Sequence, residues 1–167
     1  MGMPNRPGRL RDFDYKGRFT YFLTLCVDGR APAFEDLPFG LWAIEQLLQQ
    51  AKLRGFAVLA YSLMPDHAHI VPEGRDDDAN LRSLMYSWNT RTGFAWRQRT
   101  GSRLWQSGYY DHVLRERDNP LGVCRYVLMN PVRAGIVNEP QLYPLSGSSE
   151  YTIEEIISVA QDWKPWW

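Results

Sequence analysis

Residues 56–71 read FAVLAYSLMPDHAHIV, and this stretch decides the fold. The apolar runs on both sides of MPD, residues 64–66, predict a β-hairpin with strands over 56–63 and 67–71. Residues i and i+2 of a strand point to the same face, so His67 and His69 are expected to direct their imidazoles at one point, while Ala68 faces a core. Two convergent imidazoles suit a divalent metal ion. A polar edge strand whose histidines have no function is the alternative interpretation of the same sequence.

Further strands and helices alternate on both sides of this hairpin. Period-two alternation predicts strands over 19–27 and 109–114, and apolar residues at helical spacing predict helices over 37–53 and from Leu81 to Ala95. Asp118 or Asn119 can cap a short helix that starts at Pro120 and that ends or kinks at residues 130–131. A capping-box pattern starts one more helix over about residues 152–162.

The order of these elements predicts the fold class. Strand–helix–strand–strand–helix–strand is typical of an α+β ferredoxin-like (RRM-like) sandwich with an antiparallel sheet. We expect two helices on one face of that sheet. The other face, which carries the histidines, is then free for a ligand or for the short helix that bears Tyr126.

The composition is that of one globular domain. The chain has 167 residues, of which 44% are hydrophobic and 23% are charged. We expect a basic flexible arm over 1–16, a single domain over 17–150 and a helical tail over 151–167. No apolar run approaches a membrane span and the N-terminus has no secretory apolar region, which favours a cytoplasmic protein. Cys26 and Cys124 are expected to be buried thiols.

The charges are balanced in number but not in distribution. Arginine outnumbers lysine sixteen to three, residues 79–110 hold five arginines and no acid, and residues 134–163 hold five acids and no base. Guanidinium groups bind phosphates through paired hydrogen bonds, so this bias suits a polyanion, although an ordinary solvated surface would explain it equally well. His112 either contacts such a polyanion or forms a local hydrogen bond, and the local bond is favoured. The candidate contacts to the polyanion are Arg6, Arg9, Arg11, Arg82, Arg91, Arg97, Arg99, Arg103, His112, Arg115 and Arg133.

The short helix adds two candidate site residues. Tyr126 and Asn130 are four residues apart and therefore share one helix face. If that face lies over the histidine strand, Asn130 can give an oxygen to a metal ion and Tyr126 lies one turn away. Two imidazoles and one amide leave coordination positions open, as in a catalytic site, and a tyrosine hydroxyl can attack a polarised phosphodiester. The plainer interpretation of Tyr126 is a half-buried helix tyrosine.

Four segments of the chain resemble a known enzyme family. MPDHAHI at 64–70 resembles the histidine–hydrophobic–histidine (HUH) motif of single-tyrosine transposases, and LWQSGYYDHVLR at 104–115 is similar to the block that follows it. RYVLMNPVRAGIV at 125–137 resembles the tyrosine block, which is the most specific part, and YPLSGSS at 143–149 its trailing segment. Their order and spacing are similar to those of REP-associated tyrosine transposases, relatives of small insertion-sequence enzymes, over about residues 15–150.

This resemblance implies a fold, an activity and a site. Family members share the ferredoxin-like sandwich and cleave single-stranded DNA beside hairpins called repetitive extragenic palindromes. The tyrosine forms a 5′-phosphotyrosyl bond and leaves a free 3′-OH, with Mg²⁺ or Mn²⁺ as cofactor. The resemblance assigns His67, His69 and Asn130 as metal ligands and Tyr126 as nucleophile, in a monomeric, nucleoid-associated bacterial protein. Two departures, Ala68 in place of a bulkier hydrophobe and the neutral Asn130, are expected to lower metal affinity.

Two other functions remain open at this point. Residues 67–71 also resemble the core of histidine-triad nucleotide hydrolases, but Val71 stands where the third histidine is required. A non-catalytic module that stacks single-stranded bases on Tyr21 or Tyr61 is the other alternative, although no RNP-type motif is present. Metal dependence separates them, because only the transposase needs a divalent ion for cleavage.

Overall fold

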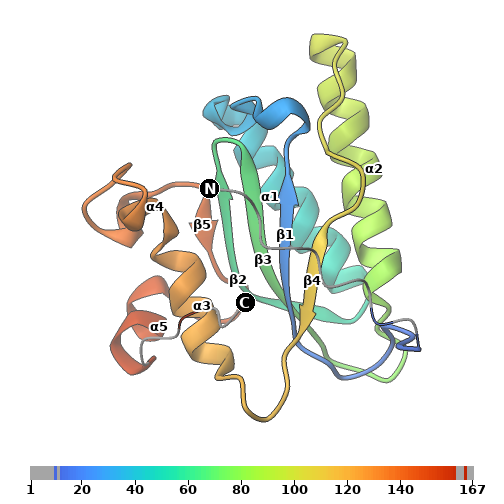
Figure 1. Cartoon of the computed structure of the whole chain (residues 1–167), viewed down its shortest axis with the longest axis vertical. Coiled ribbons are helices and arrows are strands. Elements are labelled where there is room, and N and C mark those ends of the chain that lie inside the picture. The colour runs from blue at the N-terminus through green and yellow to red at the C-terminus, as the bar shows by residue number, and fades with distance from the viewer. Residues whose placement is uncertain (1–9, 11, 161–163, 165–167) are drawn as a thin grey trace.

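The computed structural model describes residues 10, 12–160 and 164, and it shows an α+β sandwich on a five-stranded sheet (Figure 1). The strand order is β4-β1-β3-β2-β5, and every neighbouring pair is antiparallel. The first four of these strands have the ferredoxin-like order, which confirms the predicted fold class. The strands are β1 Tyr21–Cys26, β2 Phe56–Met64, β3 His67–Gly74, β4 Tyr110–Val113 and β5 Ser146–Gly147.

Helices cover both faces of the sheet. Figure 1 shows α1 and α2 together on one side of the molecule, and α3, α4 and α5 on the other. Side chains of β1 alternate accordingly: Leu23 and Leu25 enter the core beneath α1 and α2, whereas Phe22 enters a second core with Val127 of α3. Ala68 is fully buried in the first core, as expected. The helices are α1 Leu37–Leu53, α2 Leu81–Thr100, α3 Pro120–Leu128, α4 Asn130–Arg133 and α5 Ile153–Val159.

Local capping explains where the later helices begin. Asn119, rather than Asp118, caps α3 by accepting a hydrogen bond from the backbone of Gly122. Thr152 and Glu155 form the predicted capping box of α5. The helix expected to run to residue 162 ends at Val159, and α5 packs against α3. These contacts hold the end of the described chain against the second face of the sheet.

Two elements differ from the sequence-based expectations. β3 continues to Gly74, beyond the expected end at residue 71, because its later residues still pair with β2. β5 was not predicted, since two residues are too short to show any periodicity. Its segment is fixed from outside: the hydroxyl of Tyr143 donates to the carbonyl of Leu63 at 2.6 Å, and the amide of Leu63 donates to Leu145 at 2.9 Å.

The N-terminal segment joins the core earlier than the expected arm over 1–16 allows. Tyr15 is buried, and Phe13 packs edge-on against both Tyr15 and Phe19. Packing therefore begins by Phe13. Lys16 forms an ion pair with Asp78. The three arginines expected in the arm, Arg6, Arg9 and Arg11, lie outside the described residues. Among the described residues, none forms a helix that is both long and apolar enough to cross a bilayer.

Candidate active site

His67 and His69 lie at the start of β3, next to the β2–β3 turn. Cys26 of β1 is opposite His67 and Thr24 is opposite His69 in the strand register. The two imidazole rings have centroids 4.8 Å apart. They lie on the face of the sheet that α3 covers, so the expected convergence of the two rings is present.

Each histidine ring is held through its Nδ1 atom. Asp66 Oδ1 lies 2.7 Å from the Nδ1 of His67, and the guanidinium of Arg30 pairs with the other carboxylate oxygen at 2.9 Å. Thr24 Oγ1 lies 2.9 Å from the Nδ1 of His69. These bonds leave the Nε2 atoms as the ligating nitrogens, the pattern by which an outer carboxylate or hydroxyl orients a metal-binding imidazole. Arg30 takes a left-handed φ of 56°, a strained conformation that typically costs about 1–3 kcal/mol and clusters at functional sites.

Burial keeps both imidazoles neutral. It lowers the pKa of His67 below its usual value, against the opposing effect of Asp66. It lowers the pKa of His69 to about 3, and a proton on His67 or the charge of Arg133 acts in the same direction. Neutral imidazole is the form that binds a metal ion, so the pair is in its ligating state at neutral pH.

Tyr126 lies on the same face through the last turns of α3. The ring of Phe22 stacks on His69 with centroids 5.4 Å apart, and Tyr126 meets Phe22 edge-on at 6.2 Å. Tyr126 is half-buried in this row of rings. The helix that bears Tyr126 therefore lies over the histidine strand, which is the condition for the tyrosine and the histidines to form one site.

Arg133 connects Tyr126 to Asn130. The chain breaks from α3 into α4 at Met129, and the guanidinium of Arg133 donates to the backbone carbonyl of Tyr126 at 2.8 Å. A continuous helix would direct the Asn130 amide at that carbonyl. The same guanidinium lies 4.0 Å from the centroid of the Tyr126 ring and 3.5 Å from Asn130 Oδ1. Burial lowers the pKa of Arg133, and Tyr126 opposes that shift.

Asn130 has a polar atom without a partner. Its Nδ2 is buried and forms no hydrogen bond within the described part of the chain. Among the described residues, Asn130 forms no hydrogen bond or ring contact with either histidine, and no group of three His, Cys, Asp or Glu side chains there could hold a metal ion. The unpartnered atom is the amide nitrogen, while the oxygen faces Arg133. By donor chemistry, two neutral imidazoles and an amide oxygen suit a divalent cation.

The candidate DNA-binding arginines separate into different environments. Arg82 lies over the ring of Tyr15 at 5.0 Å, and Arg99 pairs with Asp36. Arg97 and Arg103 line one pocket. Arg91 is exposed on α2, and the backbone amide of Arg115 donates to Asp118. His112 Nε2 also bonds Asp118, at 3.2 Å, which is the local bond favoured from the sequence.

The contact of Arg133 with Tyr126 was missed by sequence reasoning, which placed Arg133 only among general DNA contacts. A seven-residue separation predicts no contact of this kind, because it presumes a continuous helix. The signal available in the sequence was Pro131, which lacks a backbone N–H and marks the break that lets Arg133 fold back.

Comparisons with known proteins agree with the motif-based resemblance. No protein-family model matches the chain. A curated REP-associated tyrosine transposase of Escherichia coli K12 is 26% identical over 97 residues, which are 56% of this chain and 54% of that protein. The chain thus spans about half the length of this relative.

A solved structure shows the shared fold. It is a REP-associated tyrosine transposase bound to a REP hairpin, and it superposes with a TM-score of 0.68 at 20% identity, covering 83% of this chain and 81% of the other. In sequence and in fold, the chain is therefore similar to REP-associated tyrosine transposases.

Proposed function

We propose that this protein cleaves single-stranded DNA beside hairpin sequences and transfers the strand through a 5′-phosphotyrosine at Tyr126. The observation that carries the proposal is the placement of Tyr126, with Arg133 on its ring, on the face where His67 and His69 converge. The similarity to REP-associated tyrosine transposases supports a repetitive extragenic palindrome as the hairpin. We propose a monomer acting at the bacterial nucleoid.

The chain's own residues supply the covalent step. The phenolic oxygen of Tyr126 attacks the phosphorus, the bond from phosphorus to O3′ breaks, and the departing O3′ takes up a proton to become a 3′-OH. The phenolic proton passes to solvent. The positive charge of Arg133 favours the negative charge that develops on the phenolic oxygen. Strand transfer is the reverse reaction, in which an incoming 3′-OH attacks the phosphotyrosine and releases Tyr126.

His67, His69 and Asn130 are the residues that would hold Mg²⁺ or Mn²⁺. Bound there, the ion would polarise a non-bridging phosphodiester oxygen. Asp66 and Thr24 fix the orientations of the two imidazoles beforehand. Because no ligand in this set carries a charge, the affinity for the ion is expected to be modest.

The covalent adduct provides the test. Wild-type protein is incubated with Mn²⁺ and a labelled single strand that carries a hairpin, and a denaturing gel detects protein-linked label. Tyr126→Phe should abolish the adduct while DNA binding persists, since only the attacking oxygen is lost. Tyr86→Phe is the matched control, because Tyr86 is exposed on α2. Wild-type amounts of adduct in the Tyr126 variant would disprove the assignment.

The structure favours neither alternative function. Val71, which stands where a triad hydrolase needs its third histidine, is a fully buried residue of the second core. Tyr21 is fully buried in the first core, and the partly buried Tyr61 packs against the same core. Neither ring therefore lies on an open surface for base stacking.

A further inference from the structure

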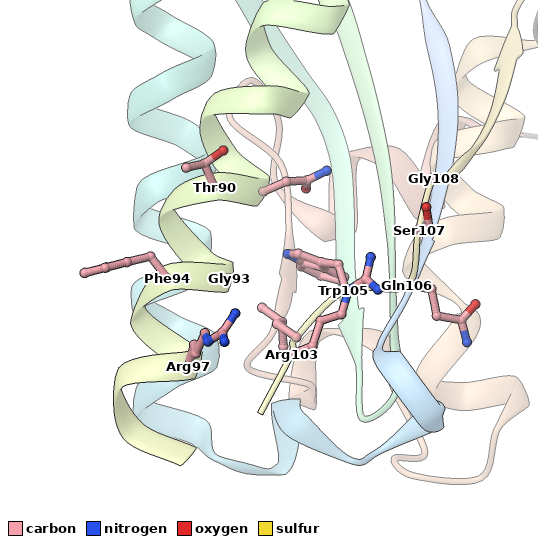
Figure 2. Close-up of a pocket in the computed structure, with 11 residues that line it drawn as sticks. Thr90, Gly93, Phe94, Arg97, Arg103, Trp105, Gln106, Ser107 and Gly108 are labelled. Carbon is pink, nitrogen blue, oxygen red and sulfur yellow. The ribbon is translucent and has the colours of Figure 1, made fainter. Parts of the chain in front are cut away.

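An open pocket lies between α2 and the segment that follows it. Its volume is about 480 Å³, within the roughly 300–1,000 Å³ typical of small-ligand sites. Figure 2 shows Gly93 and Arg97 on the α2 side, and Arg103, Trp105 and Ser107 on the other. No residue proposed above for the chemical step lines this pocket.

The charge of the pocket is positive. Arg97 and Arg103 line it, and no carboxylate does. Neither guanidinium has an ion pair or hydrogen bond to another described residue, whereas the neighbouring Arg99 is paired with Asp36. Hydroxyl and amide groups of Thr90, Gln106 and Ser107 add hydrogen-bonding capacity. Two unpaired guanidinium groups on opposite walls, with polar groups nearby, suit a phosphate.

Gly93 is the least expected residue of the pocket. It lies in the middle of α2, where glycine typically costs about 1 kcal/mol relative to alanine. Its φ is not positive, and a Cβ added there would meet nothing within 4 Å. Neither backbone conformation nor internal packing therefore requires glycine. Because Gly93 lines the pocket and carries no side chain, it leaves the helix backbone open to close approach by a ligand.

The pocket lies at the same end of the sheet as the histidines, but beside α2, on the opposite face. The amide of Gln106 donates to the carbonyl of Cys26 at 2.9 Å, and Cys26 is opposite His67 in the register. Trp105 bridges to Val27, so this segment forms the edge of the sheet, two strand spacings or about 10 Å from β3. A strand of nucleic acid that occupies both sites would pass around this edge.

We propose that this pocket is a second DNA subsite, which receives an unpaired nucleotide of the strand that enters the histidine site. Its phosphate lies between Arg97 and Arg103, and its sugar and base lie against Gly93. The inference rests on the proposed function for the identity of the ligand as DNA. An unpaired nucleotide fits because a concave pocket admits a residue that has left the base stack, whereas a duplex presents its backbone on a convex surface.

Binding without cleavage tests the two arginines. Fluorescence anisotropy of labelled oligo-dT, without divalent metal, is measured over a range of salt concentrations for Arg97→Gln, Arg103→Gln and the double variant. Each substitution should weaken binding several-fold and flatten the log–log salt slope by about 0.7. Lys52→Gln removes one exposed positive charge from the end of α1 and should leave the slope unchanged. Pocket variants that behave like Lys52→Gln would overturn the proposal.

Gly93→Ala separates ligand binding from stability. The substitution should raise the melting temperature by about 2–4 °C, because alanine favours the helix. It should nevertheless weaken oligo-dT binding several-fold, because the added methyl group occupies the pocket. Wild-type affinity in this variant would contradict the proposal.

A blunt duplex and the adduct assay complete the design. The arginine variants should lose less affinity for the duplex than for oligo-dT, and equal losses would overturn the assignment to an unpaired nucleotide. If the chain forms the Tyr126 adduct but the pocket variants bind like Lys52→Gln, the subsite is wrong and the proposed function stands. If the pocket variants lose binding but no adduct forms, the subsite stands and the proposed chemistry is wrong.

Discussion

The two faces of the sheet use the same strands for different purposes. Beneath α1 and α2, the core contains most of the largest fully buried side chains, with Trp88 the largest, and its interior is almost wholly apolar. Beneath α3, the core is smaller and its edge carries His69, Tyr126 and Arg133. The first face holds the fold together, while the second has polar groups whose positions are set by specific contacts. Substitutions should therefore separate stability from activity according to face.

The largest expected effect is on stability, at Trp88. Trp88→Ala should lower the free energy of unfolding by about 3–5 kcal/mol, since it opens a cavity in the first core. It also removes the 2.8 Å hydrogen bond from the indole to the carbonyl of Ala43. Chemical denaturation monitored by circular dichroism gives the value. Tyr126→Phe, on the second face, should change stability by less than about 0.5 kcal/mol, and a large loss there would erase the contrast between faces.

Arg133→Gln should give the next largest effect, on the rate of adduct formation. Removing a charged donor beside a developing negative charge typically lowers the rate by about 10²–10³-fold. Arg133→Lys should restore part of the rate, because it keeps the charge but not the planar stacking on the ring. Single-turnover adduct formation at saturating DNA is the measurement. If both variants lower the melting temperature but leave the single-turnover rate of adduct formation unchanged, Arg133 is purely structural.

The contrast between faces also explains what the sequence could predict. α1 begins and ends at the expected residues, and the hairpin of β2 and β3 is where its apolar runs and turn place it. Apolar periodicity carries that information because it reports burial. The His67–His69 pair is also local, since strand geometry alone puts both rings on one side.

Other features depend on contacts between distant segments. β5 exists because Tyr143 and Leu145 bond to Leu63, eighty or more residues earlier in the chain. The acid-free run of arginines suggests one continuous basic surface, yet Arg99 is neutralised by Asp36 whereas Arg97 lines a pocket. Spacing along one helix cannot predict which of these side chains meets a partner from another element.

Thr24→Val should have a smaller effect, confined to the metal-dependent reaction. The substitution keeps the shape and β-propensity of the side chain but leaves the Nδ1 of His69 without its hydroxyl partner. Loss of such an orienting group typically lowers metal affinity or activity by about 10–100-fold. Titration of adduct formation with Mn²⁺ should show a higher metal requirement. Thr20→Val is the control, because Thr20 bonds Glu73 and not a histidine. Unchanged Mn²⁺ dependence would mean that Thr24 does not position the ring.

The smallest expected effect tests how far the polar character of the second face extends beneath α3. Cys124 is fully buried two residues before Tyr126, and burial, aided by the charge of Glu73, raises the pKa of its thiol to about 12. In the unfolded chain the pKa of a cysteine thiol is about 8.5. The neutral thiol therefore contributes its full stabilisation below that pH, and the contribution is lost as the pH rises toward the folded pKa.

At pH 9.5 the loss should reach about 1.4 kcal/mol, while at pH 7 it should be near zero. Unfolding free energies of the wild type and Cys124→Ala, measured from pH 7 to 9.5, isolate the thiol from the buried tyrosines, which titrate in both proteins. The difference in unfolding free energy between the wild type and Cys124→Ala should shrink as the pH rises. A constant difference would show that the Cys124 thiol ionises as readily in the folded protein as in the unfolded chain, and is therefore solvated. The polar region of the second face would then extend beneath α3, instead of ending at the edge where Tyr126 and Arg133 meet the histidines.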